Sequence, residues 1–237
     1  MFSEIVRDYW TPKDQALNTS RADELQVIID EEQPGNRSLM VLELVDGTGT
    51  VTLSPKHASR IGLIHGSSVS QSGLHSALDE ASVVMNDPDH LFYLPVEEQS
   101  SVKRERPTEE TRQLSMEDAE VFAQFVRIAP EGDLDEAFVE LNHWLVFGTF
   151  LDGRLVSAAS MYPWKGTRLA DLGVITLPEY RGIGLAKRTV RAMSARALSE
   201  GFEPQYRCQI DNESSVALAH AAGFARFGSW HVIKSDN

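Results

Sequence analysis

The residues whose types and spacing best suit a chemical task lie between positions 181 and 188. Gly182, Gly184 and Ala186 follow a predicted strand and begin a predicted helix. A helix N-terminus presents unpaired backbone N–H groups and the positive end of the helix dipole, so it binds anions. Small residues leave those amides open to close approach. We therefore predict that this turn holds a phosphate group.

The helix behind the turn is cationic, although the protein as a whole has a formal net charge of -13. Residues 181–199 hold no acid and five bases: Arg181, Lys187, Arg188, Arg191 and Arg196. We expect Lys187 and Arg188, one turn along the helix, to meet a further phosphate, and Arg188 and Arg191 to face solvent or ligand. A P-loop motif is absent, and Lys187 replaces the third glycine of a dinucleotide fingerprint. A plain glycine turn beside a solvated cationic helix stays open as the alternative.

The surrounding pattern predicts the elements that position this turn. A hairpin at 144–151 and 155–162 turns at Asp152-Gly153. The other predicted elements are a helix at 116–128 with Ser115 as its N-cap, a strand at 169–177, a helix at 182–199, a strand at 205–210, a helix from Asn212 to 222 and strand residues at 224–233. Alternating helices and strands of this kind predict an α/β fold with a mixed sheet flanked by helices.

The N-terminal half predicts a smaller α/β domain. Its predicted elements are strands at 39–44, 50–53 and 91–94 and helices at 55–62 and 74–81. Residues 97–113 contain almost nothing apolar, so we predict a linker there. Residues 1–20 are polar and are expected to be irregular. The expected domains are therefore residues 1–110, of unknown role, and residues 111–237.

Two segments resemble the GNAT superfamily of N-acetyltransferases. Pro178 to Ala186 contains Arg181-Gly182-Ile183-Gly184 and resembles the family's R/Q-x-x-G-x-G/A signature. Asn212-Glu213-Ser214-Ser215, followed by Gly223-Phe224, resembles its N-x-x-S/A…G-F segment. The resemblance covers about residues 111–237. It implies a mixed, splayed β-sheet and an acetyl-CoA-dependent N-acetyltransferase whose acceptor is a small-molecule or protein amine.

The resemblance also implies a cofactor site. Backbone amides from Gly182 to Lys187, with Arg181, Ile183, Gly184 and Ala186 in the same motif, would hold the pyrophosphate. Backbone groups near Val174 and Thr176 would pair with the pantetheine arm in a gap between two strands. Asn212 would contact the same arm, or would serve only as a helix N-cap.

Catalysis in the family is direct attack of an amine on the thioester, which needs a base because an amine of pKa about 10.4 must first lose a proton. Asp171 is the candidate base. A salt-bridged Asp171, paired with Arg168, is the alternative. Ala219 stands where many family members carry a Tyr that protonates the leaving thiolate. An acyl-CoA-binding regulatory module with little or no transferase activity is therefore the second functional hypothesis.

Composition restricts the remaining possibilities. Cys208 is the only cysteine, so intrachain disulfides are impossible, and we expect no metal site and only a packing role for this thiol. No apolar run approaches the roughly 18 residues of a membrane helix, and no signal peptide is recognisable. The acidic surface argues against a nucleic-acid partner. We expect a cytoplasmic protein without a membrane partner; the acceptor and the oligomeric state stay open.

Overall fold

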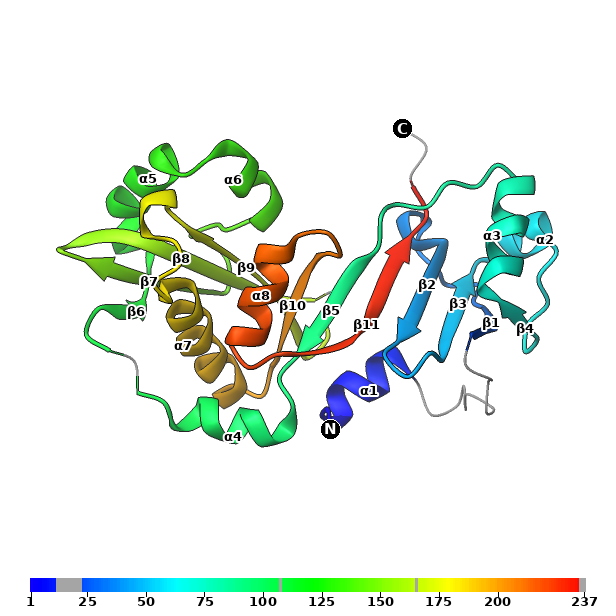
Figure 1. Ribbon diagram of the computed structural model, residues 1–237, viewed down its shortest axis with the longest axis horizontal. Coiled ribbons are helices and arrows are strands. Elements are labelled where there is room, and N and C mark those ends of the chain that lie inside the picture. Colours follow the sequence, from blue (N-terminus) through cyan, green and yellow to red (C-terminus); the bar gives the residue numbers. More distant parts are fainter. Residues whose placement is uncertain (12–22, 107, 165, 235–237) are drawn as a thin grey trace. The chain divides into compact units, whose positions relative to one another are not determined.

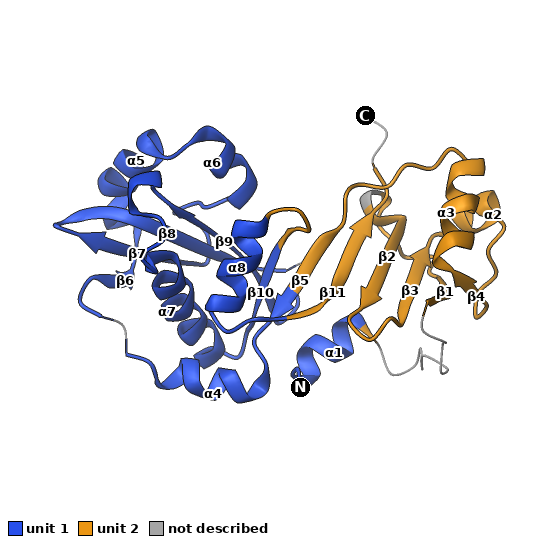
Figure 2. Ribbon diagram, in the orientation of Figure 1, with its two compact units in different colours: residues 1–10, 92–207, 213–225 blue, residues 11–91, 208–212, 226–237 orange. Residues whose placement is uncertain are grey.

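The computed structural model describes residues 1–11, 23–106, 108–164 and 166–234, which form two compact units (Figures 1 and 2). The first unit consists of Met1–Trp10, Phe92–Arg207 and Glu213–Ala225. The second consists of Thr11–Leu91, Cys208–Asn212 and Arg226–Asn237. Each unit therefore takes residues from both halves of the chain.

The first unit contains a mixed sheet. Its strands lie in the order β6 (Thr111–Gln113), β7 (Leu145–Leu151), β8 (Arg154–Pro163), β9 (Leu169–Thr176) and β10 (Glu203–Gln209). The next strand is β5 (Asp89–Tyr93), of which only Phe92 and Tyr93 belong to this unit. Neighbours from β6 to β9 are antiparallel, whereas β9 and β10 run parallel. The β7–β8 hairpin turns at Asp152-Gly153, where both residues have positive φ, as the sequence predicts.

Helices cover both faces of this sheet. Ala158 and Val146 pack with Phe122 and Phe125 of α5 (Ala119–Ile128). On the opposite face, the hydroxyl groups of Thr149 and Ser157 hydrogen-bond to Thr189 of α7 (Leu185–Ser199). The other helical elements of the unit are α1 (Glu4–Trp10), α4 (Val96–Arg104), η3 (Met116–Asp118), α6 (Glu131–Ala137), η4 (Pro178–Tyr180) and α8 (Glu213–Ala221).

The predicted N-cap at Ser115 is confirmed. The Ser115 hydroxyl accepts a hydrogen bond from the Glu117 N–H, and the Asp118 carboxylate accepts one from the Ser115 N–H, which completes a capping box. Arg112 pairs with Asp118 and holds this box against β6. The start of the α5 region is thus fixed by residues adjacent in sequence.

The second unit contains five paired strands. Its strand order is β4 (Ser68–Ser70), β1 (Glu24–Ile29), β3 (Gly49–Leu53), β2 (Leu39–Leu44) and β11 (Ala225–Val232). The β1–β3 pair is parallel, and β4–β1, β3–β2 and β2–β11 are antiparallel. Residues from α2 (Pro55–Ile61) and α3 (Gln71–Glu80) pack with the strands in one core. A short helical turn, η2 (Gly35–Arg37), precedes β2.

The structure confirms most predicted elements and corrects two regions. Residues 97–113, expected to be a linker, form α4 and β6 instead. Val102 is the one fully buried apolar residue of α4, and its acids pair with α7, so the local pattern carried almost no helix signal. Residues 4–10, expected to be irregular, form α1 with Val6 and Trp10 buried; residues 12–20 lie outside the described ranges.

The compact units divide the chain differently from the expected boundary at residue 110. Residues 92–110 belong to the first unit with the C-terminal elements, and Arg226 onward belongs to the second because β11 pairs with β2. Independent folding of residues 1–110 stays a prediction. Within the described ranges, no helix is both long enough and apolar enough to span a membrane.

Candidate functional site

The first feature of the candidate site is an open edge of β9. Strand β8 pairs with β9 as far as Thr176, but the pairing of β10 with β9 ends at Leu172. The Leu177 N–H donates to Val156 in β8. Because backbone groups alternate in direction along a strand, those of Val174 and Thr176 point toward the β10 side. The two parallel strands therefore part beyond Leu172, which is the expected splayed geometry.

The second feature is the glycine turn between β9 and α7. Gly182 and Gly184 have φ values of +79° and +85°, in the left-handed region that glycine adopts without strain. Gly184 is the N-cap of α7, and as a glycine it has no side chain that could cap the helix amides. A Cβ built on Gly184 meets nothing within 4 Å. The space beside Gly184, at the start of α7, is thus open, which is what a phosphate-binding turn requires.

The side chains of the turn differ in what they do. Arg181 donates from Nε to the Thr176 carbonyl at 3.0 Å and forms an ion pair with Asp133 of α6. Its guanidinium is thus used to hold the turn against β9. Ile183 is 65% exposed, and Ala186 lies one residue inside the helix. The backbone, rather than the Arg181 side chain, is the part of this turn that is free to bind an anion.

The third feature is a cavity of about 480 Å³ that begins at the glycine turn and follows α7. One end is lined by Gly184, Lys187 and Arg188. The remaining lining residues are Glu98 and Glu105 from the α4 segment, Arg191, and Ala221 and Gly223 at the end of α8. The cavity therefore joins the predicted phosphate turn to a wall that contains carboxylates.

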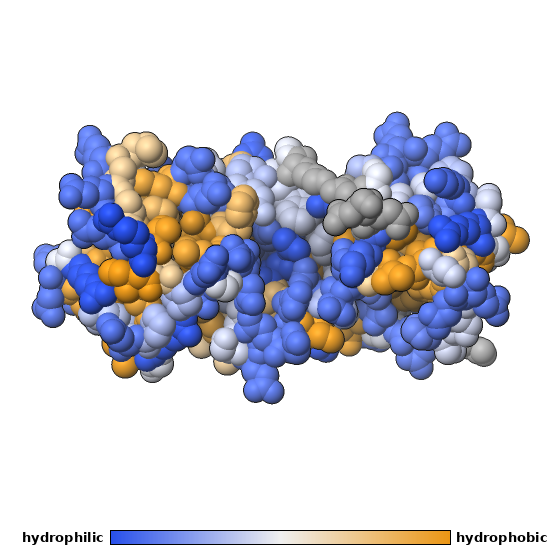
Figure 3. Space-filling model, turned by 90° about the horizontal axis from the view of Figure 1, so that it is seen from above, coloured by the Kyte–Doolittle hydropathy of each residue, from blue (hydrophilic) through white to orange (hydrophobic). Residues whose placement is uncertain are grey.

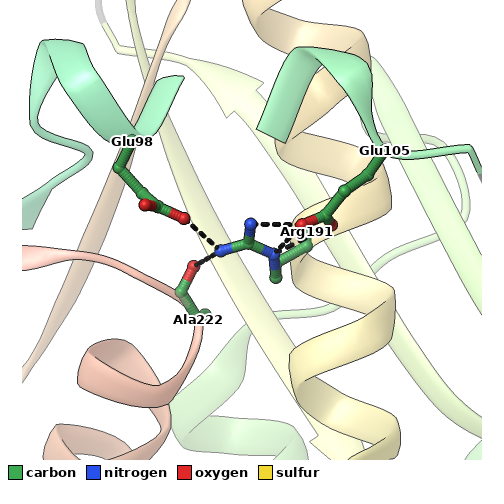
Figure 4. Close-up of polar contacts among 4 residues, drawn as sticks. All are labelled: Glu98, Glu105, Arg191 and Ala222. Atoms are coloured by element: carbon green, nitrogen blue, oxygen red, sulfur yellow. Dashed lines mark hydrogen bonds and ion pairs between the residues drawn. The ribbon is translucent and has the colours of Figure 1, made fainter. Parts of the chain in front are cut away.

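Arg191 forms the centre of that wall (Figure 4). Its Nε donates to both oxygens of Glu105 at 2.9 Å, and Nη1 donates to Glu98 at 2.8 Å and to the Ala222 carbonyl at 2.7 Å. These bonds raise the pKa of Arg191, and the Arg191 hydrogen bond holds the pKa of Glu105 below its usual range. Arg191 was expected to face solvent or ligand. It lines the cavity, but its side chain is buried because α4 packs over this side of α7.

Gly223 makes room for this bridge. A Cβ at position 223 would come within 2.8 Å of both Arg191 Nη1 and Glu98 Cγ, and its φ is +94°. No side chain fits there without displacing the guanidinium or the carboxylate. Gly223 is part of the second segment that resembles the GNAT family. In this protein, local packing against Arg191 and Glu98 explains why a glycine stands there.

The cations next to the cavity also have acidic partners. Arg188 forms an ion pair with Glu110, which lies just before β6. Lys187 lies close enough to Glu105 to help lower the pKa of that carboxyl. The predicted contact of Arg188 with a phosphate would therefore compete with an existing contact to Glu110.

Asp171 is buried in β9, and its carboxylate accepts hydrogen bonds from three side chains. It accepts hydrogen bonds from Tyr162 at 3.1 Å, Gln205 at 2.9 Å and Arg207 at 3.1 Å. Its ion-pair partner is Arg207, not the Arg168 considered from the sequence, whose guanidinium lies over Phe202. The register of β8 and β9 has no bulge, so the Asp171 side chain lies on the face opposite to Thr176.

Sequence reasoning missed the side chains that surround Asp171. Gln205 also accepts a hydrogen bond from the Tyr93 hydroxyl, which in turn accepts one from Trp10 at 2.6 Å. Burial raises the pKa of Tyr162 to about 12 and that of Tyr93 well above its ordinary value. These residues come from α1, β5, β8 and β10, so no local sequence pattern links them.

An aromatic cluster adjoins Asp171 on the α6 side. The rings of Phe138, His143 and Tyr162 contact one another with centroids 4.9–5.9 Å apart. Phe138 is 52% exposed, and Figure 3 shows hydrophobic surface gathered over the α5 and α6 part of the first unit. Burial lowers the pKa of His143, which contacts Ser160 at 2.8 Å.

The remaining residues that the sequence singled out are Asn212, Ala219 and Cys208. Asn212 directly precedes α8 and belongs to the second unit, so its contact with a cofactor stays a prediction. Ala219 is fully buried. Cys208 is buried, and burial raises the pKa of its thiol to about 11, which leaves it protonated and unreactive. No cluster of three or more metal-binding side chains occurs among the residues that the structure describes.

Comparison with known proteins places these features in context. The sequence profile of the Acetyltransferase (GNAT) family matches residues 109–224. The uncharacterized N-acetyltransferase YdfB of Bacillus subtilis (strain 168) is 41% identical over 85 residues, which are 36% of this chain and 33% of YdfB. The chain thus spans about a third of that relative.

Solved structures resemble the chain at low sequence identity. A putative GNAT acetyltransferase from Novosphingobium aromaticivorans is 21% identical, with a TM-score of 0.47 over 64% of this chain and 66% of that chain. A GNAT acetyltransferase from Colwellia psychrerythraea is 17% identical, with a TM-score of 0.48 over 70% and 63% of the two chains. A GCN5-related N-acetyltransferase-like protein from Streptococcus suis is 16% identical, with a TM-score of 0.46 over 91% and 90%.

Proposed function

Residues 109–224 belong to the GNAT family of acetyltransferases, and from this premise we propose that the protein transfers an acetyl group from acetyl-CoA to an amine. The observation that supports the proposal is that an unpaired strand edge and an anion-binding turn follow one another along the chain. The open edge of β9 at Val174 and Thr176 leads directly to the uncapped amides of α7. A ligand with an extended amide-containing arm and a diphosphate fits this combination of an unpaired strand edge and an anion-binding turn.

The residues of the chain have distinct proposed roles. Amides from Gly182 to Lys187 would bind the diphosphate, and the backbone of Val174 would pair with the pantetheine amides. Thr176 offers its N–H, because its carbonyl already accepts from Arg181. Acetyl-CoA would supply the activated thioester carbonyl. Asn212 would contact the pantetheine arm.

The acceptor is proposed to be an amine that approaches from the α6 side. Residues 131–140 contain five carboxylates and neither Lys nor Arg. Such a segment attracts cations and favours a protonated amine on a small molecule or a basic protein segment. The exposed ring of Phe138 offers apolar contact to the carbon skeleton of that amine.

Asp171 is proposed as the terminal proton acceptor, working through the Tyr162 hydroxyl. Tyr162 is half-buried and already donates to Asp171 at 3.1 Å. An amine proton taken up by the Tyr162 oxygen would be matched by transfer of the Tyr162 proton to Asp171. This route is consistent with a carboxylate too buried to contact the acceptor directly.

Thiol release from acetyl-CoA tests the transferase proposal directly. We expect one or more cationic amines, from a panel of polyamines, amino sugars and lysine peptides, to raise the rate of CoA release. Asp171→Asn should then lower kcat by about 10²–10⁴-fold without changing the Kd of CoA. Unchanged kcat in a folded Asp171→Asn variant would reduce Asp171 to a structural ion-pair partner of Arg207.

A second function is an acyl-CoA-binding regulatory module. The observation in its favour is that Asp171 already accepts from three donors while Ala219 offers no acid to the leaving thiolate. The same assay separates the two functions. Tight CoA binding with no amine-dependent thiol release across the panel would support the binding module and contradict the transferase.

A further inference from the structure

The cavity along α7 has different chemistry at its two ends. Gly184 and the uncapped amides lie at one end, with Lys187 and Arg188 beside them. Arg191, Glu98 and Gly223 lie at the other. Seven residues of α-helix separate Gly184 from Arg191, a rise of about 10 Å. The cavity thus offers an anion site and, roughly two helical turns away, a site that contains carboxylates.

Glu98 has hydrogen-bonding capacity left over at that second site. One of its oxygens accepts from Arg191, and its other oxygen has no partner among the residues that the structure describes. Arg191, by contrast, directs Nε, Nη1 and Nη2 to Glu105, Glu98 and the Ala222 carbonyl. The group that remains to contact a ligand here is therefore an acceptor, and its natural partner is a ligand N–H or O–H donor.

We propose that Glu98 accepts a hydrogen bond from the amino group of adenine, so that α4 forms an adenosine subsite for the acyl donor. This inference rests on the proposed use of CoA. The adenine amino group lies on the order of 10 Å from the diphosphate, which matches the helical rise between the two ends of the cavity. Glu98 precedes the matched family segment at 109–224, so the subsite is an addition to that domain.

The subsite has a consequence for donor choice. A nucleotide-containing thioester fills both ends of the cavity, whereas a thioester on a phosphopantetheine arm of a carrier protein fills only the anion end. The protein therefore distinguishes CoA thioesters from carrier-protein thioesters, because only CoA contains the adenine that Glu98 contacts. Arg191 makes this possible because it offsets the charge of two carboxylates that line the same cavity as the anion site.

Glu98→Gln tests the hydrogen bond with little change of shape. The amide oxygen is needed to accept from Arg191, so the amide nitrogen would face the adenine amino group, donor against donor. Calorimetry would compare CoA with 1,N6-etheno-CoA, whose modified adenine has lost the amino donor, and with 4′-phosphopantetheine. Glu97→Gln is the matched control, since Glu97 is its neighbour on α4, is 72% exposed and does not line the cavity.

We expect Glu98→Gln to raise the Kd of CoA by about tenfold and to leave the Kd of etheno-CoA and of phosphopantetheine within about twofold. Glu97→Gln should change none of the three. Equal losses for CoA and etheno-CoA, or no loss for either, would overturn the adenine subsite while leaving the CoA proposal intact. Failure of the wild-type protein to bind CoA at all would overturn both. Unchanged thermal unfolding of Glu98→Gln confirms that the comparison is made on folded protein.

Discussion

Gly184 is the residue at which a single added side chain should have the largest effect on cofactor binding. Its φ is +85° and the space beside it is open, so a side chain there would occupy the position proposed for the diphosphate. We expect Gly184→Val to weaken CoA binding by at least about tenfold, because charge-assisted hydrogen bonds contribute roughly 1.5–3 kcal/mol each. Calorimetry with CoA measures this loss.

Gly201 provides the matched control for backbone strain. It has φ of +79°, also has nothing within 4 Å of an added Cβ, and lies at the opposite end of α7. Gly201→Val should cost similar stability but leave CoA affinity unchanged. Equal weakening of CoA binding in the two variants would mean that strain, and not obstruction of the amides, causes the effect.

We propose that Arg188 binds the ribose 3′-phosphate of CoA, and Glu110 competes with this phosphate for the guanidinium. Removing the competing carboxylate in Glu110→Gln should therefore tighten CoA, which has this phosphate, more than dephospho-CoA, which lacks it. The pair is partly exposed, so we expect a several-fold effect that shrinks as salt rises. Affinities of both ligands at low and high salt measure it. Equal tightening for CoA and dephospho-CoA would show that Arg188 does not contact the 3′-phosphate.

At the scale of elements, the capping box at Ser115 fixes the start of the helices on the α5 face. Ser115→Ala removes the side-chain acceptor for the Glu117 N–H, and we expect it to lower the free energy of unfolding by about 1 kcal/mol. Chemical denaturation measures the loss. Ser76→Ala, inside α3, is the control and should be neutral or slightly stabilising, because Ala has the higher helix propensity. A neutral Ser115→Ala would show that the Arg112–Asp118 pair suffices.

The element that most alters the interpretation of the sequence is α4. Its sequence, rich in Glu, Lys and Arg, has the composition of a linker. Its position depends on the bridge from Glu98 and Glu105 to Arg191, nearly ninety residues later in the chain. The bridge converts a polar segment into one wall of the candidate cofactor cavity.

At the scale of the whole molecule, each unit contains a histidine whose pKa is lowered by burial: His143 in the first and His231 in the second. The unfolded chain therefore binds a proton at these residues before the folded protein does. Their contribution to stability is present above the ordinary histidine pKa of about 6.5 and is lost as the pH falls below it.

We expect the free energy of unfolding to fall between about pH 6.5 and 5 less steeply in His143→Gln and in His231→Gln than in wild type. His75→Gln is the control, because His75 is 80% exposed on α3. Half-buried Glu43 and buried Glu203, whose pKa values are raised by burial, affect the free energy of unfolding in the opposite direction. Their effect is the same in every variant, so it cancels in the comparison. If the free energy of unfolding had the same pH dependence in all four proteins, His143 and His231 would not be the source of the acid destabilisation.

The sequence by itself determined the elements that depend on local physics. The Asp152-Gly153 hairpin, the Ser115 cap, the strand before Pro178 and the helix after Gly184 each arise from turn chemistry, capping or periodicity within a few residues. The spacing of Arg181, Gly184 and Ala186 also indicated the resemblance to the GNAT family. These features are readable because their physical cause lies in neighbouring residues.

Only the tertiary structure decided which distant residues meet. Nothing near Asp171 in sequence reveals Gln205 and Arg207 as its partners, and nothing near Arg191 reveals Glu98 and Glu105. The helical nature of α4 and the pairing of β11 with β2 likewise depend on contacts between segments far apart in the chain. Buried charges need partners, and a folded chain finds them wherever the strands and helices bring them together, regardless of sequence separation.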